Sequence, residues 1–316
     1  MPEIAPERVA RPRTTGGVRT ATVGVDVGGT KTHVVALGPD GGRADVVVPS
    51  ADWRDGSLFS GADNFARLAA LVARVVPAGA VARVAYGMHG VDTPAQQAAA
   101  TAELVRHSPG PVLVVNDARL LGPAAGYTEC LTLVVGTGAA LLGTTADGTA
   151  LSADGYGAVL ADHGSAPALV RELVRAALRS ADWGTPAATL ADPAVRALCA
   201  AYAVTTLQDL ALAVSLQPAI SWGVHAPLLF EAAAHGSSLA DGVLRDAADV
   251  LARNVAALRR RGALGDVVVA AGGVITQQPL LRELLVARLA EEAPDLRLEV
   301  LTAPPVDGAL ALAATL

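Results

Sequence analysis

The sequence predicts an α/β protein composed of two similar lobes. Apolar strands at 23–27, 32–37 and 44–48 are separated first by a glycine pair and then by a glycine turn. From residue 131 the same order recurs: strand, Gly/Thr turn, strand, glycine turn and strand. A repeat of this kind indicates a duplicated unit, and the helical patterns between the strands place it in the α/β class.

After its three strands, the first lobe is expected to alternate helices with buried strands. Apolar residues recur at helical spacing after Asn64, and Thr93 followed by Pro94 is typical of an N-cap and a first helical residue. The expected elements are a helix at 64–76, a strand at 81–86, a helix at 93–107 and a strand at 112–115.

The second half of the chain is expected to be mostly helical. Ser238 is the expected N-cap of its third helix. The expected helices lie at about 165–180, 186–215, 237–262, 278–292 and 307–314, and the expected strands at 267–271 and 296–300.

These elements define the expected domain organisation. Residues 1–20 are rich in Pro, Arg and Thr and are expected to form a flexible tail. The N-terminal lobe is expected at 21–117, and the C-terminal lobe, which carries nucleotide-binding helices, at 118–304. A closing helix at 305–316 is expected to pack back on the N-terminal lobe.

The composition favours a soluble globular protein. Hydrophobic residues make up 52% and charged residues 17% of the 316 residues, and the net charge is −6, so neither disorder nor nucleic-acid binding is expected. The longest uncharged run, 210–230, contains prolines and a histidine that a membrane span would tolerate poorly. No secretory signal is expected, and Cys130 and Cys199 are expected to be reduced thiols, which fits a cytoplasmic protein.

Two glycine hairpins are candidate phosphate sites. In Asp26-Val27-Gly28-Gly29-Thr30, the glycines allow backbone N–H groups to approach an anion, and Asp26 could hold a divalent ion through water. Gly136-Thr137-Gly138 is the same device in the second lobe. Each could also be an ordinary glycine turn, but together they could bind the phosphates of a nucleotide from both sides.

Two further strand ends could carry chemistry. Asn116-Asp117 ends a buried strand, where a carboxylate could act as a general base for a hydroxyl; alternatively, Asp117 caps the following helix. Gly272-Gly273 follows an apolar strand, where it could let a base or ribose lie against the backbone; alternatively, it is a tight strand-to-helix connection.

The ordered set of motifs resembles the actin-like ATPase superfamily, which includes sugar kinases and actin. Within it, the chain is most similar to the BadF/BadG/BcrA/BcrD type, which includes N-acetylglucosamine kinases. The matching pieces are residues 24–32, Asn116-Asp117-Ala118, Gly136-Thr137-Gly138 and Asp162-His163-Gly164-Ser165-Ala166. The resemblance runs from about residue 22 to 314 and implies a two-lobed, ribonuclease H-like fold with duplicated mixed sheets.

The resemblance also implies a role for each matching residue. Asp117 is implied as the base that takes a proton from a sugar hydroxyl, and Asp26 as the acid that positions Mg²⁺. The implied ATP and phosphate ligands are Gly28, Gly29, Thr30, Lys31, Thr137, Gly138, Gly272 and Gly273. The implied substrate-binding residues are Asp52, His89, Gly90, Asn116, Asp117, Asp162, His163 and Ser165.

Three of these residues have alternative interpretations. Side chains alternate along a strand, so if Thr30 faces the nucleotide, Lys31 is expected to point into solvent rather than to the phosphates. His89 and His163 could bind substrate hydroxyls or a carboxylate, or be incidental polar side chains in loops.

The departures from the family pattern lie on the substrate side. Ser50-Ala51-Asp52-Trp53 stands where the family has an Asn-His-Trp or Ser-Asn segment, Gly87-Met88-His89-Gly90 replaces a Gly-Leu-Ser-Gly loop, and His163 replaces a Glu. The paired cysteines with which activator ATPases of this group hold an iron–sulfur cluster are missing, which disfavours that activity.

The expected function is therefore an ATP-dependent kinase with Mg²⁺. Its expected acceptor is a hydroxyl of a small sugar: N-acetylglucosamine, glucosamine or a related hexose or cyclitol. The alternative is a non-catalytic or regulatory ATP-binding module. Relatives are often dimers, so a homodimer is one expected assembly.

Overall fold

The computed structural model describes residues 20–316. The tail expected at 1–20 lies outside the described residues except for its last position. Two compact units make up the chain: unit 1 runs to Gly126 and includes Ala303–Leu316, and unit 2 is Tyr127–Thr302. No helix within residues 20–316 has both the length and the apolar character needed to cross a membrane.

The boundary expected after residue 117 differs from the structural division. The short helices η3 (Asp117–Leu120) and α3 (Leu121–Ala124) belong to unit 1 because they pack against the last helix, α13 (Pro305–Ala314). This helix also packs on the unit 1 sheet.

Each unit contains one five-stranded mixed sheet. The strands of unit 1 are β1 (Ala21–Val27), β2 (Lys31–Leu37), β3 (Arg43–Pro49), β4 (Val81–Met88) and β5 (Val112–Asn116). The strands of unit 2 are β6 (Leu131–Val135), β7 (Ala139–Thr144), β8 (Ala150–Asp154), β9 (Val267–Ala271) and β10 (Arg297–Val300).

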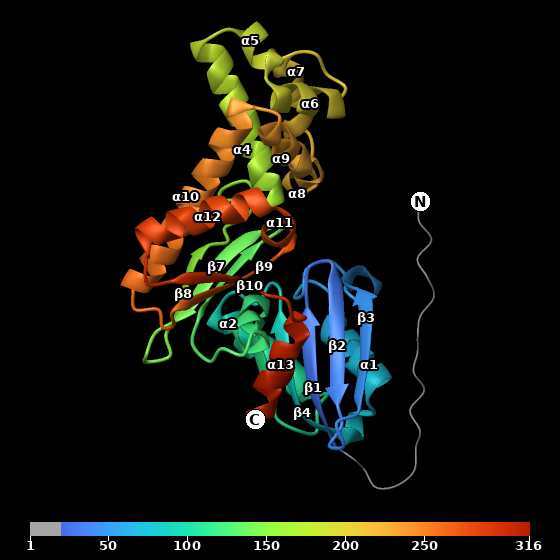
Figure 1. Cartoon of the computed structure of the whole chain (residues 1–316). Helices are drawn as coiled ribbons and strands as arrows, with labels where there is room; N and C mark the ends of the chain where they lie inside the picture. Colours follow the sequence, from blue (N-terminus) through green and yellow to red (C-terminus); the bar gives the residue numbers. More distant parts are fainter. Residues whose placement is uncertain (1–19) are drawn as a thin grey trace. The chain divides into compact units, whose positions relative to one another are not determined.

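The two sheets have the same topology. Their strand orders are β3-β2-β1-β4-β5 and β10-β9-β6-β7-β8, and each joins an antiparallel three-stranded meander to two parallel strands (Figure 1). The predicted duplication and the predicted α/β fold class are confirmed.

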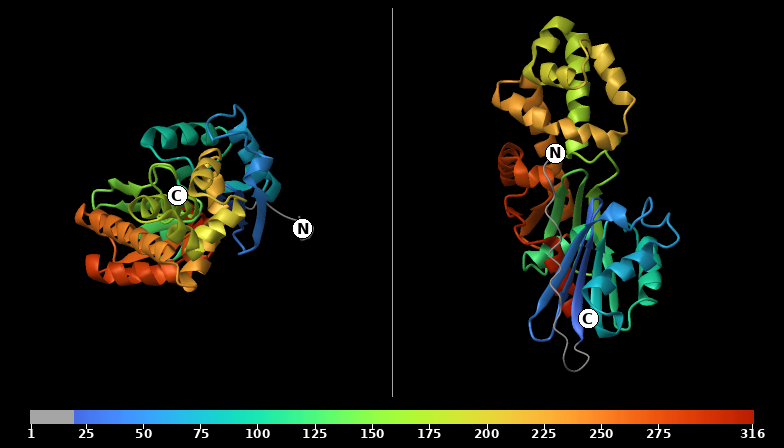
Figure 2. Two further views of the ribbon diagram at one scale, coloured as in Figure 1. Left: turned by 90° about the horizontal axis from the view of Figure 1, so that it is seen from above. Right: turned by 90° about the vertical axis from the view of Figure 1, so that its right-hand side faces the viewer.

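Helices cover both faces of the unit 1 sheet. Helices α1 (Asn64–Val75) and α2 (Pro94–Val105) pack on one face, and α13 packs on the other (Figures 1 and 2). Successive residues of β5 point to opposite faces of the sheet. Val114 packs with α1 and α2, whereas Val115 packs with Ala309 of α13. The predicted N-cap of α2 is confirmed, since Thr93 Oγ1 accepts from the N–H of Gln96.

Unit 2 combines its sheet with a large helical part. Helices α10 and α12 pack together, and α5 to α9 gather around α4 beyond the sheet (Figure 1). The helices are α4 (Ala166–Trp183), α5 (Pro186–Ala191), α6 (Pro193–Ala201), α7 (Leu207–Ser215), α8 (Ala219–Trp222), α9 (Ala226–Ala234), α10 (Ser238–Arg260), α11 (Gly273–Gln277) and α12 (Pro279–Glu292). The remaining 3₁₀ turns among residues 20–316 are η1 (Ser50–Asp52), η2 (Ala78–Ala80) and η4 (Gly223–His225).

Two helix predictions in unit 2 are wrong. The single helix expected at 186–215 is three helices, because Asp192 caps α6 ahead of Pro193 and Thr206 caps α7. The N-cap of α10 is Ser237 rather than Ser238, since the Ser237 hydroxyl accepts a hydrogen bond of 3.1 Å from the N–H of Ala240.

Candidate active site

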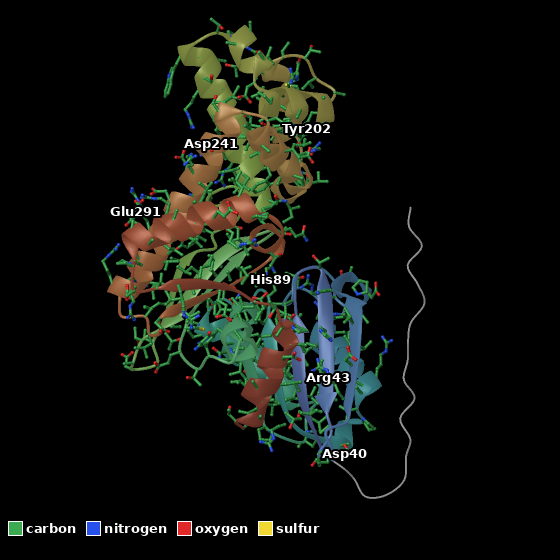
Figure 3. All side chains as sticks on the ribbon, viewed as in Figure 1. Asp40, Arg43, His89, Tyr202, Asp241 and Glu291 are labelled. Atoms are coloured by element: carbon green, nitrogen blue, oxygen red, sulfur yellow. The ribbon has the colours of Figure 1, made fainter. Side chains whose placement is uncertain are left out.

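Strand register brings three loops to one edge of the unit 1 sheet. Strands β1, β4 and β5 are parallel, with Val27 beside Met88 and Met88 beside Asn116. The glycine hairpin, His89 and Asp117 therefore follow neighbouring strand ends at the same edge. Figure 3 shows His89 at this end of the sheet.

The β1–β2 hairpin turns its carbonyl groups toward the protein. The carbonyl of Gly28 accepts from Ser50 Oγ at 2.9 Å, that of Gly29 from the Arg54 guanidinium at 3.0 Å, and that of Thr30 from the N–H of Ser50 at 2.8 Å. The N–H groups of Gly29 and Thr30 have no hydrogen-bond acceptor among residues 20–316. Exposed amides of this kind can bind an anion.

Two carboxylates and an imidazole lie beside this hairpin. The Asp117 carboxylate is 3.7 Å from His89 Nδ1, and a Cβ added at Gly29 would lie 3.7 Å from His89 Cδ2. Burial, and then the negative charge of Asp117, raise the pKa of Asp26 to about 7, although the Lys31 ammonium lowers it in part. Burial also raises the pKa of Asp117, which the neighbouring His89 lowers in part.

Asn116 and Gly90 hold the loops around these groups. The Asn116 amide donates to Asp92 Oδ1 at 2.9 Å and to the carbonyl of Val91 at 3.3 Å, and its oxygen accepts from the N–H of Ala118 at 2.9 Å. Gly90 has a φ of +86°, which a side chain would strain. Thus Asn116, rather than Asp117 alone, caps η3.

The other predicted unit 1 residues are solvent-exposed. Thr30 and Lys31 are both exposed, whereas Thr32, the next residue along β2, is fully buried. Asp52 is exposed on η1. The Lys31 ammonium is close enough to Asp26 to lower the pKa of that carboxyl, so it acts at the edge of the candidate site.

In unit 2, the second glycine hairpin meets the strand end at Gly272. A Cβ added at Gly136 would lie 3.1 Å from the N–H nitrogen of Gly273, and one added at Gly272 would lie 2.5 Å from the Val135 carbonyl oxygen. Gly272 also has a φ of +110°. Thr137 is exposed, so its hydroxyl and the Gly273 backbone border the same surface.

A buried aspartate that sequence reasoning missed organises the loop beside this hairpin. The Asp154 carboxylate, 2% exposed, accepts from the N–H of Asp162 at 2.7 Å, from the N–H of His163 at 2.9 Å and from His163 Nδ1 at 3.0 Å. Although burial alone would raise it, the hydrogen bonds from His163 and the backbone lower the pKa of Asp154. The bond to Asp154 raises the pKa of His163.

Asp154 thereby determines where the predicted Asp162 and Ser165 lie. Both Asp154 and Asp162 have positive φ, of 63° and 55°, which produces a tight loop. Asp162 Oδ2 lies 3.2 Å from a Cβ added at Gly138, and burial raises the pKa of Asp162. Ser165 is fully buried and its hydroxyl caps α4 by accepting from the N–H of Ala168, so its side chain faces the protein.

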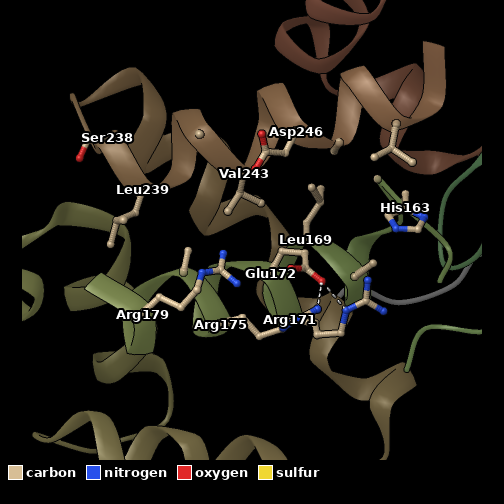
Figure 4. Close-up of a pocket in the computed structure, with 16 residues that line it drawn as sticks. His163, Leu169, Arg171, Glu172, Arg175, Arg179, Ser238, Leu239, Val243 and Asp246 are labelled. Atoms are coloured by element: carbon tan, nitrogen blue, oxygen red, sulfur yellow. Dashed lines mark hydrogen bonds and ion pairs between the residues drawn. The ribbon is translucent and has the colours of Figure 1, made fainter. Parts of the chain in front are cut away.

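His163 lines a separate cavity in unit 2. This cavity, about 340 Å³ in volume, lies between α4 and α10, with His163 at one end and Arg179 toward the other (Figure 4). Glu172 pairs with Arg171 at 2.8 Å and with Arg175 at 3.0 Å along its α4 wall. The ring of His163 is thus held by Asp154 while one side of it faces this cavity.

The ordered motifs extend over nearly the whole chain. The model of the BadF/BadG/BcrA/BcrD ATPase family matches residues 23–311. The chain belongs to this family. The predicted resemblance is therefore confirmed, and the matched range includes the unit 1 and unit 2 hairpins described above.

Several of the proteins to which this chain is similar are named as sugar kinases. The chain is 26% identical to the N-acetyl-D-glucosamine kinase of Dictyostelium discoideum over an alignment that covers 92% of this chain and 97% of the relative. Among solved structures, a candidate N-acetylglucosamine kinase from Chromobacterium violaceum has a TM-score of 0.69 and 22% identity, covering 94% of this chain and 99% of the other. A ROK glucokinase from Streptomyces griseus, in complex with glucose and AMPPNP, has a TM-score of 0.53 and 17% identity, with 94% and 99% covered.

The unit 1 carboxylates fit the requirements of Mg²⁺ in an ATPase of this family. No group of three or more His, Cys, Asp or Glu side chains within residues 20–316 forms a metal cluster. Mg²⁺ does not need one, because it keeps several waters and is held by one or two carboxylates together with phosphates. Asp26, whose pKa burial and Asp117 raise to about 7, is a carboxyl whose charged form a cation would stabilise.

Proposed function

We propose that this protein is an ATP-dependent kinase that transfers a phosphoryl group to a hydroxyl of a small sugar. N-acetylglucosamine, glucosamine or a related hexose or cyclitol is the proposed acceptor. One observation carries the proposal: Asp117 and Asp26 lie beside a glycine hairpin that exposes two unpaired amides. The N-acetylglucosamine kinase and glucokinase relatives support this reaction class.

Asp117 is the proposed general base. Its carboxyl lies at a strand end next to the hairpin, where it can accept the proton of an acceptor hydroxyl. A pKa raised by burial makes the carboxylate more basic than a solvated aspartate. His89, exposed and 3.7 Å from this carboxylate, is proposed to donate to a substrate oxygen.

The remaining polar groups are assigned to the nucleotide. In unit 1, the amides of Gly29 and Thr30 and the Thr30 hydroxyl are proposed to bind phosphate oxygens of ATP. In unit 2, the amides of Thr137 and Gly138 are proposed to do the same. Asp26 would hold Mg²⁺, which when bound neutralises phosphate charge and orients ATP. Gly272 and Gly273 are proposed to contact adenosine.

Two predicted substrate residues are proposed to act indirectly. Asn116 uses both amide hydrogens and its oxygen within the protein, and Ser165 uses its buried hydroxyl to cap α4. We propose that both position neighbouring loops, whereas Asp162, beside Gly138, is a candidate for direct contact with a ligand.

The proposed function is tested by ADP release. Mg·ATP is supplied with hexoses, amino sugars, N-acetyl amino sugars and cyclitols, and the rate is compared for the wild type and Asp117→Asn. The variant is expected to lose about 10²–10⁴-fold in kcat with ATP affinity retained, because that is the usual contribution of a positioned base.

A matched control is Asp45→Asn, which makes the same change at an exposed position of the unit 1 sheet. Its turnover is expected to equal that of the wild type. Unchanged turnover in Asp117→Asn would overturn the assignment of the base. ATP binding without turnover on any acceptor would favour the alternative of a regulatory ATP-binding module.

A further inference from the structure

The segment at 50–54 binds the carbonyls of the three turn residues Gly28, Gly29 and Thr30 of the unit 1 hairpin. Ser50 binds the carbonyls of Gly28 and Thr30 through its hydroxyl and its N–H, and Arg54 binds that of Gly29. We infer that this segment, which stands where the family pattern has a sugar-site segment, positions the phosphate hairpin for ATP. The inference rests on the proposed function and names Ser50, Thr32 and Trp53 as positioning residues.

A buried chain of hydrogen bonds supports Ser50. Trp53 Nε1 donates to Thr32 Oγ1 at 3.0 Å, Thr32 Oγ1 lies 3.0 Å from Ser50 Oγ, and Ser50 Oγ donates to the Gly28 carbonyl at 2.9 Å. The Ser50 hydroxyl has one hydrogen, which goes to Gly28, so the Thr32 hydroxyl donates to Ser50. All the donors point toward the hairpin, and the order of the chain is Trp53, Thr32, Ser50 and Gly28.

The chain is shielded from water along its length. Thr32 and Ser50 are 0% exposed and Trp53 is 7% exposed. A buried hydroxyl that loses its partner is costly, so each member keeps the next one in place. The indole, a rigid side chain fixed by the core, anchors the far end.

Peptide geometry transmits this positioning to the phosphate-binding groups. In a planar trans peptide the carbonyl of one residue and the N–H of the next point in opposite directions. The bond from Ser50 to the Gly28 carbonyl therefore orients the N–H of Gly29 outward. The bond from Arg54 to the Gly29 carbonyl does the same for the N–H of Thr30.

The hairpin needs this external support because it contains two adjacent glycines. Its own closing bond, from the N–H of Gly28 to the carbonyl of Lys31 at 2.9 Å, does not fix the Gly28–Gly29 and Gly29–Thr30 peptide planes. Glycine has wide conformational freedom, so these planes could otherwise rotate. Amides that are already oriented before the anion binds do not lose conformational entropy on binding, so the anion binds more tightly.

The experiment compares Ser50→Ala and Thr32→Val with the rescue variant Thr32→Ser, which keeps the hydroxyl. Loss of one bond in the chain is expected to weaken ATP affinity, and raise the KM for ATP, by about five- to twentyfold. The KM for the sugar is expected to stay within about twofold of the wild type, and Thr32→Ser is expected to retain wild-type ATP affinity.

Thr132→Val is the matched control. Thr132 is a buried threonine of strand β6 in unit 2, and its Oγ1 has no hydrogen-bond partner within the described chain. The same substitution there is expected to leave ATP affinity unchanged. This control separates loss of the hydrogen-bond chain from the general effect of a Thr→Val change in a strand.

ATP affinity is measured directly by calorimetry as well as through KM. If no sugar is phosphorylated but the variants still weaken ATP binding, the proposed function fails while this inference holds. Thr32→Val and Ser50→Ala proteins that melt at lower temperature but bind ATP as tightly as the wild type would overturn the inference. A rise in the sugar KM with no change for ATP would overturn it too.

Discussion

Replacing Asp26 by asparagine is expected to stabilise unit 1 above neutral pH while removing catalysis. Burial and the charge of Asp117 raise the pKa of Asp26 from 3.8 to about 7. Between these pH values the folded protein holds a proton that the unfolded chain has released, so the free energy of unfolding falls as pH rises through this window. Asparagine keeps the shape of the side chain and lacks this titration.

The magnitude follows from the two pKa values. A tenfold change in proton affinity corresponds to about 1.4 kcal/mol, so ionising Asp26 costs the folded state at most about 4 kcal/mol at pH 8. The side chain is only partly buried, and solvent reduces this cost, so Asp26→Asn is expected to gain about 1–2 kcal/mol at pH 8. At pH 4 the gain is expected to be close to zero.

The assay is urea unfolding at pH 4 and pH 8, with hydrogen exchange of β1 to follow unit 1 separately from unit 2. Asp63→Asn, at an exposed unit 1 position just before α1, is the control and is expected to show no such pH-dependent gain. A variant less stable than the wild type at pH 8, or equally more stable at both pH values, would refute the reasoning. The activity of Asp26→Asn is measured alongside, and its expected loss identifies Asp26 as a site where function opposes stability.

Three further predictions concern unit 2. His163→Asn removes the ion pair with Asp154; because the bond to Asp154 raises the pKa of His163, the stabilisation is present below pH 6.5 and is lost as pH rises through the folded-state pKa. The difference in melting temperature between wild type and variant should therefore be larger at pH 6 than at higher pH, and a constant difference would contradict this. Gly272→Ala is expected to destabilise the protein by roughly 2–4 kcal/mol, since its φ is +110° and the new Cβ would lie 2.5 Å from the Val135 oxygen. Gly273→Ala, whose Cβ would meet nothing within 4 Å, is expected to melt like the wild type and to weaken ATP binding, and equal ATP affinities would remove Gly273 from the adenosine site.

The strand pattern of the chain was readable from its sequence because turns and strands have local causes. The glycine pairs and the alternation of short apolar runs predicted both meanders, and both sheets contain them. Thr93 and Pro94 predicted the start of α2 for the same reason, since capping depends on residues three positions apart. The helix at 186–215 was mispredicted because a continuous apolar pattern concealed the breaks at Asp192 and Thr206.

Residues whose function depends on distant partners were not readable in this way. Asp154 carries no motif, and only its positive φ and its bonds to residues eight and nine positions later reveal its role. Ser50 was likewise read with the substrate segment, although its partners are Gly28 and Thr30, some 20 residues earlier in the chain. Such contacts arise from tertiary packing, which a single sequence does not display.

The shared topology of the two sheets has a consequence for how this protein can evolve. Both glycine hairpins occupy the same position in the repeated meander, but the first is anchored by segment 50–54 and the second by the start of α4, where the N–H of Ala166 donates to the Gly136 carbonyl at 2.8 Å. A mutation in one anchoring segment can therefore change the amide orientation of one hairpin without changing that of the other. Within segment 50–54, the exposed Ala51 and Asp52 can be replaced without disturbing the core, whereas substitutions at the buried Ser50 or Trp53 are constrained.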